Sequence, residues 1–357
     1  IIALILLYGA VIVAFRQPLL GFYQLGPEIQ GMANDYLLII ALGFVFFATN
    51  PIFTAIFNGS GDSTTPFRIN AVGLVVNIIL DPVMIFGLGP FPALGVSGAA
   101  IATVIAQMTA TSLFVLEARK RPELFAHLNF FTKPDWAYVA KMFKMGLPMS
   151  LQSAFFTLIS MTIARIISDW GPMAIAVQRV GGQIEQISWL TAGGFQSAMS
   201  AFTGQNYGAK LGQRVYRGYF VGLGIVAAIG TFATLLLTLG AEHLFGIFIP
   251  EPEVIALGAS YLKIIGISQL PQAVEILTSG AFIGLGRTAP PSLVGISLNF
   301  LRVPAALILS ATALGLDGVW WAISISSILK GVVLSAWYLR FMNSNREMLD
   351  LRIERAA

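Results

Sequence analysis

Ten long apolar segments, separated by short polar or Gly/Pro-rich breaks, dominate this sequence of 357 residues. Only 11% of the residues are charged, compared with about 25% in a soluble globular domain. Segments of this length with so few charges indicate helices that cross a bilayer. We therefore expect an all-α polytopic membrane protein. Its spans should lie near residues 1–15, 34–57, 68–88, 95–117, 141–168, 173–203, 214–240, 254–283, 290–313 and 316–341.

Most of the 21 Lys and Arg residues lie in alternate connections between these segments, above all in residues 119–140 and near the C-terminus. Positive loops face the cytoplasm in multi-pass proteins. This distribution explains the net charge of +4 as a topology signal, so we expect no nucleic-acid partner. The expected location is the cell membrane (plasma or inner), with a cytoplasmic C-terminus.

An internal repeat relates the two halves of the chain. A shift of 225 residues places residues 27–66 on residues 252–291 and aligns Gly59, Gly61 and Pro66 with Gly284, Gly286 and Pro291. The second copy starts near residue 141, so the first copy would start well before Ile1. We therefore expect an N-terminally truncated chain, with about ten helices present from two six-helix bundles in a parallel repeat.

The repeat also predicts a division of the chain. Residues 1–118 should form a partial N-lobe with helices 3–6, and residues 119–140 a cytoplasmic hinge loop. Residues 141–342 should form a C-lobe with helices 7–12, followed by a cytoplasmic tail at residues 343–357.

The apolar span at residues 70–87 carries Asn77 and Asp81, one helical turn apart on the same face. A carboxylate at membrane depth costs at least ~2.5 kcal/mol, so it should have a partner, face a cavity, or hold a proton or cation. A carboxylate and an amide oxygen can coordinate a hard cation such as Na⁺. In the alternative interpretation, both side chains only form hydrogen bonds between helices and hold the bundle together.

The second copy differs at these positions, because the shift places Asn77 on Arg302 and Asp81 on Ala306. We therefore expect the ion site in the first lobe alone. For Arg302, the sequence leaves open neutralisation of a buried acid, repulsion of a cation, or a structural salt bridge.

Two further acids, Glu185 and Glu275, lie deep in the second copy. They could attract a cationic drug or carry protons, and Trp189 offers a face for a cation-π contact. Alternatively, the two acids pair with Arg179, Arg302 or Lys330.

Five motifs together resemble the multidrug and toxic compound extrusion (MATE) transporters over essentially the whole chain. They are residues 59–66 (GSGDSTTP), 77–82 (NIILDP), 98–103 (GAAIAT), 146–148 (GLP) and 203–209 (TGQNYGA). The resemblance implies twelve helices in two lobes, cytoplasmic termini, and export of organic, often cationic, compounds driven by H⁺ or Na⁺.

The resemblance also implies site residues. It makes Asn77 and Asp81, with Thr103, part of an N-lobe cation or proton site completed by an Asp of the missing first helix. Gln152 stands where such proteins often have an acid, which argues against a C-lobe sodium site of that kind. The expected substrate-binding residues are Gln152, Glu185, Trp189, Glu275 and Arg302.

We therefore predict an antiporter that exports organic, mainly cationic, drugs or metabolites by alternating access. We expect a monomer that contacts membrane lipid and a small-molecule substrate, with no cofactor besides the coupling ion. The alternative within the same superfamily is a flippase for lipid-linked saccharides, which should show several cations in its cavity. An enzyme is not expected, because no span contains a His for a nucleophile to use.

Overall fold

The computed structural model describes residues 2–22, 26–125 and 135–345. All regular secondary structure in these ranges is helical. The chain divides into two compact units, residues 1–133 and 134–357, and the boundary falls within the predicted hinge. The predicted lobe and tail boundaries stay predictions.

The described part of the first unit contains six helices, and α4 and α5 pack against each other most extensively. They are α1 (Ile2–Phe22), α2 (Pro27–Leu42), α3 (Phe44–Gly59), α4 (Thr64–Phe86), α5 (Gly95–Arg119) and the short α6 (Pro122–Phe125).

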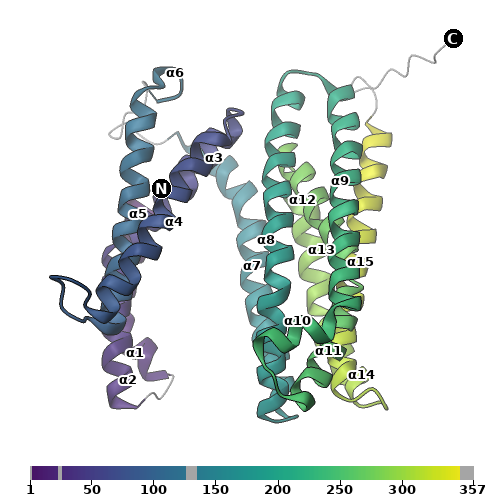
Figure 1. Cartoon of the computed structure of the whole chain (residues 1–357). Coiled ribbons are helices and arrows are strands. Elements are labelled where there is room, and N and C mark those ends of the chain that lie inside the picture. Colours follow the sequence, from purple (N-terminus) through teal and green to yellow (C-terminus); the bar gives the residue numbers. More distant parts are fainter. Residues whose placement is uncertain (1, 23–25, 126–134, 346–357) are drawn as a thin grey trace. The chain divides into compact units, whose positions relative to one another are not determined.

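The second unit is a bundle in which the long helices run side by side, with α10 at one end (Figure 1). Its helices are α7 (Trp136–Ser168), α8 (Pro172–Gly208), α9 (Gly212–Leu239), α10 (Ala241–Phe248), α11 (Pro252–Gly266), α12 (Gln269–Gly284), α13 (Ala289–Phe300), α14 (Arg302–Ser310) and α15 (Leu316–Ser344).

Each of the ten predicted spans coincides with helix, but three are not continuous. The spans at 34–57 and 254–283 are helix pairs, α2 with α3 and α11 with α12, bent by 48° and 46°. The span at 290–313 is divided between α13 and α14, next to Pro304, which has no N–H for the carbonyl of Phe300. Among the described residues, six helices are long and apolar enough to cross a membrane, with residues 289–310 counted as one, or up to eight if each bent pair is one span.

The structure confirms the internal repeat. The shift of 225 that aligns the sequences places the start of α2 on the start of α11, and the end of α3 on the end of α12. It also places the bend between α2 and α3 on the bend between α11 and α12. The turns that follow contain Gly61 and Gly286, whose φ angles are 93° and 71°, a conformation that favours glycine.

A second pair of glycines shows that the copies also pack alike. A Cβ on Gly98 of α5 would overlap the carbonyl oxygen of Met84 on α4. At the matching place in the second unit, a Cβ on Gly318 of α15 would lie 2.5 Å from the carbonyl oxygen of Leu309. Because neither glycine has a Cβ, both helix pairs approach closely there.

The predicted hinge loop is shorter in the structure than in the sequence prediction. α6 forms within it, and α7 begins at Trp136, before residue 141, where the sequence places the start of this helix. The side chain of Asp135 caps α7 by accepting a 2.9 Å hydrogen bond from the backbone N–H of Ala137, which favours this earlier start. Residues 126–134 of the hinge lie outside the described residues, as do residues 346–357 of the tail.

Glycines in α12 let this helix lie against α8. A Cβ on Gly280 would overlap the carbonyl oxygen of Gln196, and one on Gly284 would lie 2.5 Å from that of Ser200. On the other side of α12, Phe282 contacts the buried Tyr338, with ring centroids 4.9 Å apart. The acids predicted on α8 and α12 are therefore carried by two closely packed helices.

Candidate functional site

In the first unit, Asn77 and Asp81 lie on α4 and are directly linked. The Asn77 Nδ2 donates a 3.1 Å hydrogen bond to the Asp81 Oδ1. Both side chains are half-buried, whereas Leu74 and Ile78 on another face of the helix are exposed. The pairing predicted from the one-turn spacing is thus present in the fold.

Thr103 lies at the same level on α5, which runs antiparallel to α4. Gly98 of α5 contacts Met84, and Ala110 of α5 would meet a Cβ on Gly73 at 3.3 Å, so Thr103 falls opposite the stretch between Asn77 and Asp81. Its hydroxyl donates to the carbonyl oxygen of Ala99 at 2.8 Å. No hydrogen bond among the described residues joins it to Asn77 or Asp81.

A separate polar cluster of the first unit surrounds the buried Asn50 on α3. Its amide nitrogen donates to the side-chain oxygen of Gln107 at 2.7 Å, and its oxygen accepts from the hydroxyl of Thr111 at 2.7 Å. Asn50 corresponds to Glu275 in the second copy under the 225 shift. Both copies therefore bury a polar side chain at this position. In the first copy this side chain is the neutral Asn50, and its hydrogen-bond partners are also neutral.

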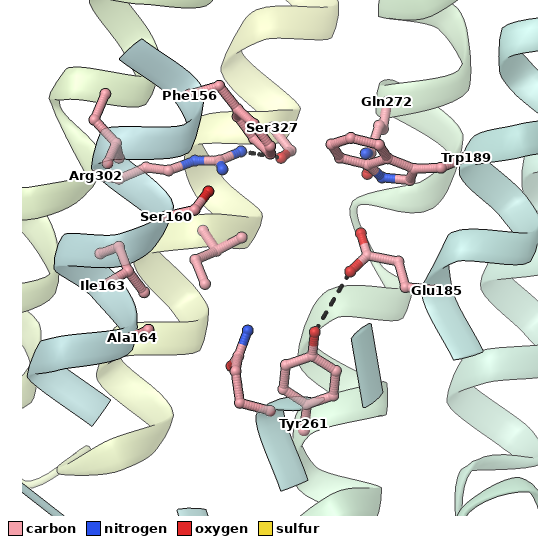
Figure 2. A pocket seen from close by; sticks show the side chains of 13 residues that line it. Phe156, Ser160, Ile163, Ala164, Glu185, Trp189, Tyr261, Gln272, Arg302 and Ser327 are labelled. Carbon is pink, nitrogen blue, oxygen red and sulfur yellow. Dashed lines mark hydrogen bonds between the residues drawn. The ribbon is translucent and has the colours of Figure 1, made fainter. Parts of the chain in front are cut away.

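The second unit contains two adjoining cavities, of about 210 Å³ and about 470 Å³. Both are lined by Phe156 of α7, Trp189 of α8 and Gln272 of α12. The Phe156 and Trp189 rings are in contact, with centroids 5.6 Å apart. Figure 2 shows the smaller cavity, in which Arg302 lies on one side and Glu185 on the other.

The carboxylate of Glu185 is held by two donors from the bent pair α11 and α12. Tyr261 donates to its Oε2 at 3.4 Å, and Gln269 donates to its Oε1 at 3.4 Å. Gly181, one turn before Glu185 on α8, makes room for this, because a Cβ there would overlap the Tyr261 ring. Trp320 packs edge-on against the Tyr261 ring, with ring centroids 5.3 Å apart. This contact holds the position of the tyrosine ring.

Arg302 is at the N-terminus of α14 and is only 6% exposed. Its Nε donates to the hydroxyl of Ser326, and its Nη2 donates to that of Ser327 at 2.9 Å, both on α15. No carboxylate of the described residues lies within 4 Å of the guanidinium. The structural salt bridge that the sequence left open for Arg302 is therefore not formed in the described part of the structure, where its partners are serines.

Glu275 of α12 pairs with Lys330 of α15, and the ammonium nitrogen lies 3.5 Å from the carboxylate Oε2. Both residues line the larger cavity. This pairing is one of those considered in the sequence analysis for Glu275, whereas Glu185 has uncharged hydrogen-bond partners. Arg179, the third cation considered, is exposed and lines neither cavity.

The structure brings the remaining predicted residues to these cavities. Gln152 of α7 lines the larger one and packs so closely on α13 that a Cβ on Gly295 would overlap its amide nitrogen. Trp189 lines both cavities and is 37% exposed. All five predicted substrate-binding residues therefore belong to one cavity region of the second unit.

Several residues of this region were not predicted as site residues. They are Tyr261, Gln269, Gln272, Asn299 and Ser327. Gln272 and Asn299 are both only 3% exposed, and their side-chain oxygens have no hydrogen-bond partner in the described part of the chain. The sequence signal that could have identified the amide residues is a polar amide inside an apolar span. The spacing of the sequence could not show which face of each helix borders a cavity.

No group of three or more His, Asp or Glu side chains in the described ranges could hold a metal ion. Asn77 and Asp81 could supply two oxygen ligands to a cation such as Na⁺. Hard cations generally take more oxygen ligands than that, so further ligands would have to complete such a site.

Comparison with known proteins gives a consistent result. The family model MatE matches residues 1–83 and 148–308. The chain is 30% identical over 305 residues to the "Probable multidrug resistance protein NorM" of Thermotoga maritima, covering 84% of this chain and 65% of that protein. It is 28% identical to the "Probable multidrug resistance protein YoeA" of Bacillus subtilis, covering 78% of this chain and 60% of that protein. The chain thus spans less than two thirds of both relatives.

A third relative is the "FAD transporter" of Shewanella oneidensis, which is 24% identical and matched over 91% of this chain and 72% of its own length. Among solved structures, "MATE in the bent conformation" superposes with a TM-score of 0.87 at 20% identity, covering 98% of this chain and 78% of that one. The bent form of the Vibrio cholerae MATE transporter VcmN gives 0.85 at 21% identity, covering 97% and 77%. These structures share the fold, and together with the apolar helices the relatives establish a multi-pass membrane protein.

Proposed function

Because the chain belongs to the MatE family, we propose that the protein is a cation-coupled antiporter that exports organic, mainly cationic, compounds by alternating access. The coupling ion is H⁺ or Na⁺. The relatives described as multidrug resistance proteins support export as the activity. The observation that carries the coupling is the Asn77–Asp81 pair on an apolar helix long enough to span a membrane.

The Asn77–Asp81 pair can bind a proton or a cation because one of its carboxylate oxygens is not used. The hydrogen bond uses one carboxylate oxygen of Asp81, and its Oδ2 accepts from no group in the described part of the chain. That oxygen can take a proton or, with the Asn77 carbonyl oxygen, contact a cation. Either event neutralises a charge whose burial in the membrane is costly. Ion occupancy would therefore favour a state in which Asp81 is more deeply enclosed.

The substrate would bind in the cavities of the second unit. The Glu185 carboxylate supplies a negative charge for an organic cation, and the Phe156–Trp189 pair supplies aromatic faces for the apolar part of the compound. Drug-sized ligand pockets are about 300–1,000 Å³, and the larger cavity of about 470 Å³ falls in this range.

The proposal includes the location and the partners. We place the protein in the cell membrane, plasma or inner, with its C-terminus in the cytoplasm, because positive residues gather in that tail and in residues 119–140. The partners are membrane lipid and a small-molecule substrate, and the protein acts as a monomer. The lipid-linked saccharide flippase has less support, because the two cations that line the cavities are balanced by two acids.

Transport into proteoliposomes tests the proposal. Purified protein is reconstituted, and uptake of a fluorescent organic cation is followed under an imposed pH gradient and then under an imposed Na⁺ gradient. One gradient should drive uptake, and Asp81→Asn should abolish it while leaving insertion and folding intact. Asp169→Asn is the matched control, because Asp169 pairs on the surface with Arg165. Gradient-driven uptake that survives in Asp81→Asn would refute the assignment of Asp81.

A further inference from the structure

Arg302 is a buried cation that pairs with no carboxylate of the described residues. Its contacts are the hydroxyls of Ser326 and Ser327, which leaves Nη1 without a partner among the described residues. Burial of a charge is costly unless it is paired. In the same unit, the buried Lys330 is paired in this way, because its ammonium nitrogen lies 3.5 Å from a carboxylate oxygen of Glu275. Arg302 instead has its guanidinium at the wall of the smaller cavity.

The two serines orient the guanidinium more than they neutralise it. They occupy Nε and Nη2 and fix the plane of the group against α15. Arginine presents a planar fork of donors that fits a carboxylate or a phosphate. In Figure 2 the side chain extends into the cavity with its bond to Ser327, and Glu185 lies on the opposite side. The cavity therefore presents an anion-binding group and a cation-binding group on different walls.

The buried amides of Gln272 and Asn299 add acceptors. Each residue is 3% exposed, neither side-chain oxygen has a partner among the residues that the structure describes, and both residues line the larger cavity. A buried acceptor without a donor is unfavourable. Because both oxygens are themselves buried, they add partial negative charge to this wall of the cavity, which favours a cationic group over a carboxylate.

The charges that line the two cavities balance. Glu185 and Glu275 oppose Arg302 and Lys330, so the region carries no net formal charge. A ligand with a net charge would leave one charge uncompensated in a place of low dielectric. A ligand with both signs matches the walls and keeps the balance.

We propose that the cavity region of the second unit binds amphoteric aromatic compounds, which carry a carboxylate for Arg302 and an amine or amidinium for Glu185. The aromatic part lies against Phe156 and Trp189, which line both cavities. This inference rests on the proposed export function and narrows its substrate class. It also gives Arg302 a role other than repulsion of cations.

Two dyes provide a matched pair of probes. Rhodamine 110 and rhodamine 123 share the same aromatic cation, but rhodamine 110 has a free carboxylate where rhodamine 123 has a methyl ester. Binding to the purified protein in detergent is measured by fluorescence anisotropy at neutral pH. The wild-type protein should bind rhodamine 110 about tenfold more tightly, the effect expected of a hydrogen bond to a charged group.

Variants then assign the preference to its residue. Arg302→Gln should remove the preference by weakening rhodamine 110 about tenfold with little change for rhodamine 123. Arg302→Lys should retain part of the preference, and Ser327→Ala should reduce it. Arg179→Gln is the control, because it removes an exposed arginine that lines neither cavity. Glu185→Gln should weaken both dyes alike, because both carry the cation.

The outcomes separate this inference from the export function. Equal binding of the two dyes by the wild-type protein, or a loss in Arg302→Gln that is the same for both dyes, would overturn the inference. Uptake of the dyes into proteoliposomes is measured in parallel. Gradient-driven uptake without a carboxylate preference would leave export standing and reject the amphoteric site. Preferential binding without uptake under either gradient would support the site and reject export.

Discussion

The ammonium nitrogen of Lys330 lies 3.5 Å from a carboxylate oxygen of Glu275, and the side chains are 6% and 10% exposed. The pair joins α15 to α12 at the wall of the larger cavity. A buried pair of this kind is sensitive to the loss of one partner, because the other charge is left uncompensated. It therefore fixes the arrangement of two helices that carry cavity residues.

We expect Lys330→Met to lower the free energy of unfolding by about 3–5 kcal/mol, because Glu275 would remain charged and unpaired. The double variant Glu275→Gln with Lys330→Met should recover much of this loss. Thermal unfolding of the purified protein measures both. Lys263→Met is the control, because its pair with Glu242 is 52% and 67% exposed, and surface pairs contribute about 0–1 kcal/mol. Equal losses in the two single variants would contradict a special role for the buried pair.

At the end of α3, the carboxylate of Asp62 should make stability depend on pH. The side-chain and backbone donors of Thr65 favour its charged form, and Arg121, 2.7 Å away, adds to the effect. Together they hold the pKa of Asp62 below its usual value of 3.8. Its contribution to folding is therefore fully present above that usual value and is lost as the pH falls through the lowered one.

The measurement compares the melting temperatures of the wild-type protein and Asp62→Asn from neutral to acidic pH. The difference should be largest near neutrality and should shrink as the medium becomes acidic. Thr65→Val should reduce the effect more than Arg121→Gln, because the Thr65 hydrogen bonds are its largest cause. A difference that stays constant over the whole pH range would rule out this linkage.

The glycines at the matching helix contacts should be equally intolerant of substitution. Gly98→Ala and Gly318→Ala would each place a Cβ against a backbone carbonyl of the neighbouring helix, which cannot move aside as a side chain could. Overpacking of this kind costs about 1–3 kcal/mol. Gly224→Ala on α9 is the control, because nothing lies within 4 Å of its added Cβ. Melting temperatures should fall for the first two variants and not for the third.

Trp189 should contribute to binding through its ring face. Trp189→Leu is expected to weaken rhodamine 123 binding by roughly fivefold, the equivalent of about 1 kcal/mol for a cation-π contact. Trp189→Phe should restore part of the affinity, since it keeps an aromatic face beside Phe156. Trp136→Leu serves as the control, because Trp136 lies at the start of α7 and is 74% exposed. Unchanged binding in Trp189→Leu would show that the ring does not contact the dye.

The helices were largely predictable because each apolar segment is long and bounded by Gly, Pro or charged residues. The bends were not predicted. At the break between α11 and α12, Pro271 has no N–H for the carbonyl of Ile267, whereas the break between α2 and α3 has no proline in the corresponding position. The bend near Gly43 occurs where an added Cβ would overlap Val104 of α5, a contact distant in sequence. The positions of most helices and the duplication followed from local pattern, whereas the bend at Gly43 followed from packing between helices.

The sequence by itself determined that the chain is a duplicated set of membrane-crossing helices, that Asn77 and Asp81 share a face one turn apart, and that the second copy carries Arg302 in place of an amide. Helical periodicity and the cost of charge in a bilayer are enough for this. The tertiary structure alone decided that Lys330, and not Arg302, pairs with Glu275, and that Tyr261 and Gln269 hold Glu185. These choices depend on distances between helices far apart in the sequence, and those distances are set by where glycines allow close approach.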